Sequence, residues 1–205
     1  DAVMATKVSG PGTIAEISSY MDEIEKAHGM QENTVRLLAL IETAQGIRNV
    51  YRIAAEGSRI CGMLLGAEDL TADLHCRRTK EGTEIFYARN RLVCAARAAG
   101  IEAYDTPFPD VEDMEGLKKD TELAKMLGFT GKAVISPRHI ECVNEAFSPS
   151  MEEIEYSRLV LETIQEAKKQ GKGVVSLKGK MIDAPIVERA RQVCQAAEQI
   201  YGGIS

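Results

Sequence analysis

Two acidic residues follow short apolar runs in a pattern that predicts metal binding. The run 37–41 leads directly into Glu42, and the run 63–65 leads through Gly66 to Asp69. If both runs are neighbouring parallel strands, the two carboxylates meet at the carboxyl edge of the sheet, where they would repel each other. A hard divalent cation relieves that repulsion, and Mg²⁺ typically takes one or two carboxylates plus water and substrate oxygens. The spacing therefore predicts an Mg²⁺ site at Glu42 and Asp69.

Glu42 also has a structural alternative. A carboxylate directly after a strand can sit at the start of the next helix, where it interacts favourably with the helix dipole, and Glu42 alone would suit that role. Glu68 points in a different direction from Asp69, so we expect Asp69 to be the ligand. The pairing of two acids on successive strands favours the metal.

The elements that must position these acids alternate along the chain. Apolar strands joined by helices predict a parallel sheet. The strand ends are spaced by roughly 30 residues, which suits a (β/α)₈ TIM barrel, although a doubly wound sheet would give similar spacing. The predicted strands are Ala2–Val8, Arg36–Ile41, Gly62–Gly66, Glu102–Asp105 and Ala133–Ser136, and the predicted helices are Thr13–His28, Gly46–Ala55, Ile85–Ala99, Gly116–Leu127 and Glu152–Gln170.

Several helix ends carry recognisable signals. The stretches Thr13–Glu16 and Ser150–Glu153 have the capping-box pattern at a helix start. Gly100 and Gly128 stand where a left-handed residue would end a helix.

The pattern changes after Ser136, where Pro137 ends the last predicted strand. A long charged helix, a Gly- and Lys-rich stretch at 171–180 and a closing helix at Ala184–Tyr201 follow. This composition predicts an appended lid or oligomer arm. We therefore predict two parts, a barrel portion at 1–148 and a C-terminal helical extension at 149–205.

Composition excludes some classes of function. The chain has 205 residues, 44% hydrophobic and 27% charged, with a net charge of −6, which argues against a nucleic-acid or anionic-membrane binder. No apolar run approaches the roughly 18 residues of a membrane span, and no signal-peptide pattern opens the sequence. Five dispersed cysteines fit reduced thiols rather than a disulfide framework. We expect a cytoplasmic protein.

Several longer motifs carry a family resemblance. They are ALIETAQG at 39–46, LGAEDLTADL at 65–74, RTKEGTE at 78–84, GFTGK at 128–132 and GKMIDAP at 179–185. Together they resemble the aldolase/citrate lyase superfamily of metal-dependent TIM barrels, and within it the citrate lyase beta subunit and its stand-alone relatives. The likeness runs through essentially the whole chain.

The resemblance implies an Mg²⁺-dependent carbon–carbon lyase. Its expected reaction cleaves a citryl thioester, carried by CoA or by acyl-carrier phosphopantetheine, to oxaloacetate and an acetyl thioester. Malyl-CoA or citramalyl-CoA lyase activity is the alternative within the same class. A non-catalytic subunit of an acyl-carrier lyase complex is the alternative from another class. Glu42 and Asp69 match the family's Mg²⁺ ligands, and a homo-oligomer, a trimer or a multiple of one, is implied.

Further site residues follow from the resemblance. Asp183 matches the family's lid aspartate, which acts as acid or base at a neighbouring subunit's site, although an Asp two residues before Pro185 also suits a helix N-cap. Lys7 stands where relatives commonly have a lysine near the substrate. Arg77 and Arg78 are candidates for the phosphates of the carrier, with a solvated loop as the alternative.

The sequence departs from the family pattern in two places. Aligned to the family, Ala2–Val8 is strand four, so strands one to three are absent, together with an arginine that binds the substrate carboxylate. Five strands cannot close an eight-stranded barrel, so we expect a piece of a longer polypeptide that is inactive alone. At the last strand, where many relatives have a His and a Gln, the sequence reads Ile135-Ser136-Pro137-Arg138-His139-Ile140. We expect His139 in a loop or helix start rather than as a catalytic base.

Overall fold

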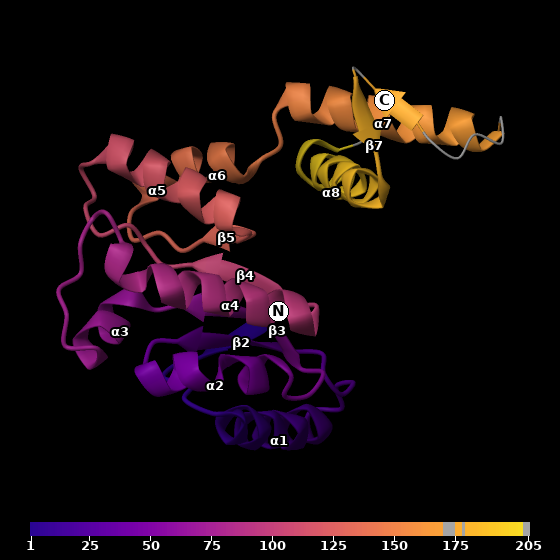
Figure 1. Ribbon diagram of the computed structural model, residues 1–205. Helices are drawn as coiled ribbons and strands as arrows, with labels where there is room; N and C mark the ends of the chain where they lie inside the picture. The colour runs from indigo at the N-terminus through magenta and orange to yellow at the C-terminus, as the bar shows by residue number, and fades with distance from the viewer. Residues whose placement is uncertain (170–174, 178, 203–205) are drawn as a thin grey trace. The chain divides into compact units, whose positions relative to one another are not determined.

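The structure is a computed structural model that describes residues 1–169, 175–177 and 179–202 (Figure 1). The chain divides into two compact units, Asp1–Phe147 and Ser148–Ser205. The first unit holds the sheet and both acidic residues predicted to bind metal.

The first unit is built on a five-stranded parallel sheet. Its strands lie in the order of the sequence, without reversal, and each pairs in parallel with the next. Because all neighbours run the same way, the carboxyl ends of all the strands gather at one edge. The strands are β1 Ala2–Ala5, β2 Arg36–Ile41, β3 Ile60–Leu65, β4 Glu102–Asp105 and β5 Gly131–Lys132.

Helices connect consecutive strands, as the right-handed crossover of a parallel sheet requires. The helix α1 packs on α2, α2 on α4 and α4 on α5, so these helices follow the order of the strands (Figure 1). The helices of this unit are α1 Pro11–Ala27, α2 Ala44–Ala54, α3 Ala67–Asp73, α4 Phe86–Ala99, α5 Met114–Leu127 and α6 Ile140–Phe147, with short 3₁₀ turns η1 Thr83–Ile85 and η2 Pro137–His139.

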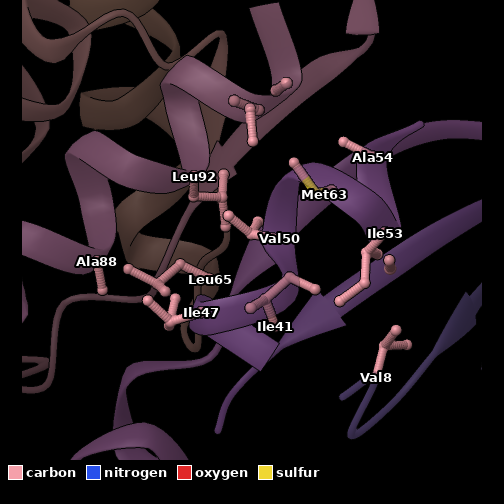
Figure 2. Packing of buried hydrophobic residues seen from close by; sticks show 14 of the residues in the cluster. Val8, Ile41, Ile47, Val50, Ile53, Ala54, Met63, Leu65, Ala88 and Leu92 are labelled. Carbon is pink, nitrogen blue, oxygen red and sulfur yellow. The ribbon is translucent and has the colours of Figure 1, made fainter. Parts of the chain in front are cut away.

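The core lies between the sheet and these helices. Ile41 of β2 and Leu65 of β3 face Val50 of α2 and Leu92 of α4, and all four side chains are fully buried (Figure 2). Burying one such side chain stabilises the fold by about 1.5–3 kcal/mol. This packing fixes the ends of β2 and β3 next to each other.

The second unit is a helical pair with a small hairpin. The helices α7 Met151–Lys169 and α8 Ala184–Tyr201 pack on each other, and β6 Val175–Leu177 pairs in antiparallel with β7 Lys180–Ile182. Its core is formed by Val160, Ile182, Val187 and Ala190.

Most predicted elements are confirmed, and two strand predictions need correction. The strand Ala133–Ser136 is wrong, because the fifth strand is Gly131–Lys132 and the chain leaves the sheet after it. The first strand ends at Ala5 instead of Val8, because Lys7 adopts a left-handed conformation with φ 52°. The end of the predicted helix at Gln170 and the stretch 171–174 lie outside the described residues.

The predicted helix signals are confirmed in three of four places. Gly100 and Gly128 end α4 and α5 with φ of 69° and 101°. The capping box Ser150–Glu153 forms reciprocal hydrogen bonds of 2.8 and 3.2 Å. The capping box at Thr13–Glu16 is wrong, because α1 already begins at Pro11, a residue that is well tolerated in the first turn.

Two global expectations can also be compared with the structure. All five cysteines are free. Within the described ranges, no helix combines the length and the apolar composition that crossing a membrane requires.

Candidate functional site

Glu42 lies at the carboxyl edge of the sheet, directly after β2. Its side chain is only 5% exposed. The backbone N–H of Lys7, at the turn after β1, donates to Glu42 Oε1 at 2.7 Å. This hydrogen bond requires the left-handed turn at Lys7. Non-glycine residues rarely adopt that backbone conformation, and here it orients the Glu42 carboxylate.

Gly66 makes room for Glu42 at the turn after β3. Its N–H donates to the carbonyl of Ile41 at 2.9 Å, which ties the ends of β2 and β3 together. A Cβ at Gly66 would lie 2.6 Å from Glu42 Cβ and 2.9 Å from Glu42 Oε2, closer than real contacts allow. The close approach therefore requires glycine at this position.

Asp69 stands in the first turn of α3, three residues beyond Gly66, and is exposed. Burial raises the pKa of the Glu42 carboxyl, and the neighbouring Asp69 carboxyl raises it further. The hydrogen bond from the Lys7 N–H lowers this pKa and so opposes both effects. The structure thus brings together the two acids that the sequence singled out. Their mutual repulsion is the electrostatic condition that a bound cation relieves.

The donor set at this edge consists of oxygens. Within the residues that the structure describes, no group of three or more His, Cys, Asp or Glu side chains gathers in a metal-binding arrangement. A cation at Glu42 and Asp69 would therefore take its remaining ligands from water or a bound substrate. Such a partial set of hard ligands fits Mg²⁺, which keeps several waters, and does not fit Zn²⁺ held in a closed site.

The predicted basic residues occupy different environments. Lys7 is exposed, and its positive charge lowers the pKa of Glu42, so it lies near the acidic pair. Arg77 is exposed. Arg78 is 6% exposed and its Nη1 donates to Glu84 Oε1 at 2.8 Å. Although burial raises the pKa of Glu84, hydrogen bonds from Thr79 and Arg78 lower it to about 2. A role for the two arginines in phosphate binding stays a prediction.

Asp183 belongs to the second unit and caps α8. Its Oδ1 accepts from the Ile186 N–H at 3.1 Å, and Pro185 occupies the first turn. The structural alternative for this residue is confirmed. A catalytic role for Asp183, which is exposed, stays a prediction.

A buried ionic cluster next to the acidic edge was missed by the sequence reasoning. Arg89 of α4 donates to both oxygens of Asp105 at 2.9 and 2.8 Å and to Asp120 at 2.7 Å. Lys132 of β5 donates to Asp105 and Asp120, each at 2.6 Å. The charges balance two against two, as buried ions require. Asp105 is therefore a hydrogen-bond and ion-pair partner of Arg89 and Lys132.

One sequence signal could have revealed this cluster. Arg89 lies on the buried face of α4 together with Leu92 and Ala96, three and seven residues further on. A charged residue in an apolar stripe needs a buried partner of opposite charge.

His139 is also fully buried, in the 3₁₀ turn η2, where its Nε2 lies 3.3 Å from the carbonyl of Val111.

A parallel sheet connected by helices, with an acidic pair at its carboxyl edge, is typical of metal-dependent α/β proteins. Comparison with known sequences identifies the family within this class. The model of the HpcH/HpaI aldolase/citrate lyase family matches residues 1–137. The chain belongs to this family.

Within the family, the chain is a homologue of citrate lyase beta subunits. It is 41% identical over 197 residues to citrate lyase subunit beta of Leuconostoc mesenteroides subsp. cremoris, covering 96% of this chain and 65% of that protein. It is 31% identical to the mitochondrial citramalyl-CoA lyase of Mus musculus, covering 97% and 61%. The chain thus spans slightly less than two thirds of the length of these relatives.

A solved structure is similar in both fold and sequence. The CitE protein of Mycobacterium tuberculosis, in complex with magnesium, acetoacetate and coenzyme A, matches with a TM-score of 0.75 and 29% identity. The match covers 96% of this chain and 68% of that one.

Proposed function

We propose that this protein is an Mg²⁺-dependent carbon–carbon lyase that cleaves a citryl thioester to oxaloacetate and an acetyl thioester. The observation that carries the proposal is the pair Glu42 and Asp69, which lie near each other at the carboxyl edge of the sheet, Glu42 directly after β2 and Asp69 in the first turn of α3. The 41% identity to a citrate lyase beta subunit supports the reaction class.

Glu42 and Asp69 would hold the metal through their carboxylate oxygens. When bound, Mg²⁺ supplies electrophilic stabilisation of the oxygen on which negative charge develops during C–C cleavage. Glu42 is prepared for this role because the Lys7 N–H fixes one of its oxygens. Asp69 is exposed, so its carboxylate is open to a ligand from solvent.

Three basic residues and one acid complete the proposed site. Lys7 stands beside Glu42 and would attract the carboxylates of the substrate. Arg77 and Arg78 would bind the phosphates of CoA or of acyl-carrier phosphopantetheine. Arg77 would do so more readily, because its side chain is exposed. Asp183 would act as acid or base at the site of a neighbouring subunit in a homo-oligomer, a trimer or a multiple of one.

We further propose that this chain forms strands four to eight of a (β/α)₈ barrel. The monotonic strand order supports a barrel wall over a doubly wound sheet, in which the order reverses at a switch point. Val3 and Met4 on the edge strand β1 are each 47% exposed, which is unusual for the apolar residues of a parallel sheet. Strands from a preceding segment would cover them.

Two other thioesters are candidate substrates besides the citryl thioester. The citramalyl-CoA lyase relative makes citramalyl-CoA a second candidate substrate, and malyl-CoA is a third. In the remaining alternative, a non-catalytic subunit, the same acidic pair would bind metal without turnover.

Product analysis tests the proposal. The full polypeptide is incubated with citryl, malyl and citramalyl thioesters, with Mg²⁺ and after its removal by EDTA, and oxaloacetate, glyoxylate and pyruvate are measured. We expect Mg²⁺-dependent release of oxaloacetate from the citryl thioester. Release of glyoxylate or pyruvate alone would redirect the substrate assignment, and Mg²⁺ binding without any product would support the non-catalytic alternative.

A further inference from the structure

The helix that carries Asp69 begins with a hydrogen bond from outside it. Ala67, the first residue of α3, donates its N–H to Thr106 Oγ1 at 3.1 Å. The two residues are 1% and 2% exposed, so water does not compete for this bond. Gly66 at the N-cap has no side chain to accept from the helix start, which leaves Thr106 to satisfy a buried donor.

The direction of Asp69 depends on where this short helix begins. The helix α3 has seven residues, and Asp69 lies two positions after Ala67. Thr71 stiffens the same turn, because its hydroxyl donates to the carbonyls of Ala67 and Glu68 at 2.9 and 3.0 Å. A shift at Ala67 would therefore move the Asp69 carboxylate with it.

Thr106 is itself anchored by the buried ionic cluster. It directly follows Asp105, whose carboxylate is held by Arg89 from α4 and by Lys132 from β5. All three of these side chains are fully buried. The acceptor for Ala67 therefore directly follows the end of β4, where the carboxylate of Asp105 is held from two other elements.

We propose that Thr106 is a positioning residue for Asp69. Through Ala67 it fixes the start of α3 and so holds the Asp69 carboxylate beside Glu42 before the metal binds. This inference rests on the proposed function of Asp69 as a ligand. Removing an outer partner of a metal ligand typically weakens metal binding about 10–100-fold.

The test compares three variants of the full polypeptide. Thr106→Val keeps the shape and removes the hydroxyl, whereas Thr106→Ser keeps the hydroxyl. Thr121→Val is the matched control, because Thr121 is also fully buried and donates only within α5, to Leu117 at 2.7 Å. Mg²⁺ affinity is measured by titration calorimetry, thermal unfolding by circular dichroism, and protection of the Ala67 amide by hydrogen exchange.

We expect Thr106→Val to weaken Mg²⁺ binding about 10-fold and to lose protection at Ala67. Thr106→Ser is expected to retain both. Thr121→Val is expected to lower the unfolding temperature while leaving the Mg²⁺ affinity unchanged. This contrast separates a positioning role from a merely structural one.

Two results would overturn the inference. One is wild-type Mg²⁺ affinity in Thr106→Val, and the other is an equal loss in Thr121→Val. Failure of the proposed function itself is recognised separately, because Asp69→Asn would then leave the Mg²⁺ affinity unchanged while Thr106→Val still exposes the Ala67 amide.

Discussion

At the scale of single residues, the candidate site depends on what Gly66 lacks. The space that a side chain would fill at Gly66 is occupied by Glu42, and the N–H of the same glycine bonds to the end of β2. On the other side, the left-handed Lys7 turns its N–H onto Glu42. Two backbone features therefore set the orientation of one carboxylate.

Replacing Gly66 with alanine tests this arrangement. The new Cβ must displace Glu42, so we expect Gly66→Ala to weaken Mg²⁺ binding at least about 10-fold by displacing a ligand, as loss of a supporting partner does. Gly12→Ala in α1 is the control, because nothing lies within 4 Å of its Cβ position. It is expected to leave the affinity unchanged and to stabilise the helix by up to about 1 kcal/mol. Unaltered Mg²⁺ titration of Gly66→Ala would refute the steric account.

The sequence predicted the identity of the acidic pair better than its surroundings. Glu42 and Asp69 were recognisable because each follows an apolar run, and the structure brings them together. The hydrogen bond from the Lys7 N–H to Glu42 was not predictable. It depends on a left-handed turn at a lysine, and not at a glycine or asparagine, the residues that usually adopt this conformation. Thr106 was missed because its partner lies 39 residues away in the sequence.

At the scale of elements, the buried ionic cluster joins α4, β4, α5 and β5. Removing one member leaves an uncompensated charge in the core. We expect Lys132→Met to lower the free energy of unfolding by about 3–5 kcal/mol in urea denaturation. Lys119→Met is the control, because Lys119 and Glu115 form an exposed pair, which contributes little to stability. Similar losses in both variants would contradict the assignment.

A second ionic group ties α1 to the other end of the sheet. Arg59, just before β3, donates to both oxygens of Glu25 at 2.9 and 2.7 Å, and Glu25 also accepts from the backbone N–H groups of Asn33 and Val35. The pKa of Glu25 is lowered from its ordinary 4.5 to about 2, mainly by the hydrogen bonds from Arg59.

The lowered pKa of Glu25 predicts acid sensitivity. Because the folded protein binds this proton less readily than the unfolded chain, the stabilisation is full above the ordinary pKa and is lost as the pH falls from about 5 to about 2. In urea denaturation, the stability difference between wild type and Glu25→Gln should shrink across that window. The control is Glu23→Gln, an exposed site on the same helix. A difference that stays constant with pH would contradict the assignment.

Elements were predictable where hydrophobic pattern and local signals agreed. The strands Arg36–Ile41 and Glu102–Asp105 and the helix Ala184–Tyr201 were placed to the residue. The fifth strand was misplaced because Ala133–Ser136 is the more apolar run, whereas pairing with β4 selects Gly131–Lys132. Long-range pairing overrode local propensity there.

At the scale of the whole molecule, the main prediction of the barrel proposal is that preceding strands cover the exposed edge strand β1. If preceding strands cover β1 in the full polypeptide, Val3→Lys should lower the free energy of unfolding by about 2 kcal/mol or more, because it places a charge in a core. Met126→Lys is the control, because Met126 is 80% exposed on α5 and should change stability by less than about 0.5 kcal/mol. Equal effects in thermal or urea unfolding would argue against a covered edge.

The central claim is that Glu42 and Asp69 together bind Mg²⁺, and titration calorimetry of the full polypeptide tests it most directly. Glu68→Gln serves as the control, because Glu68 is an exposed acid adjacent to Asp69. We predict that Glu42→Gln and Asp69→Asn each weaken Mg²⁺ binding at least about 10-fold, while Glu68→Gln binds as the wild type does. Unchanged Mg²⁺ affinity in either Glu42→Gln or Asp69→Asn would contradict the account.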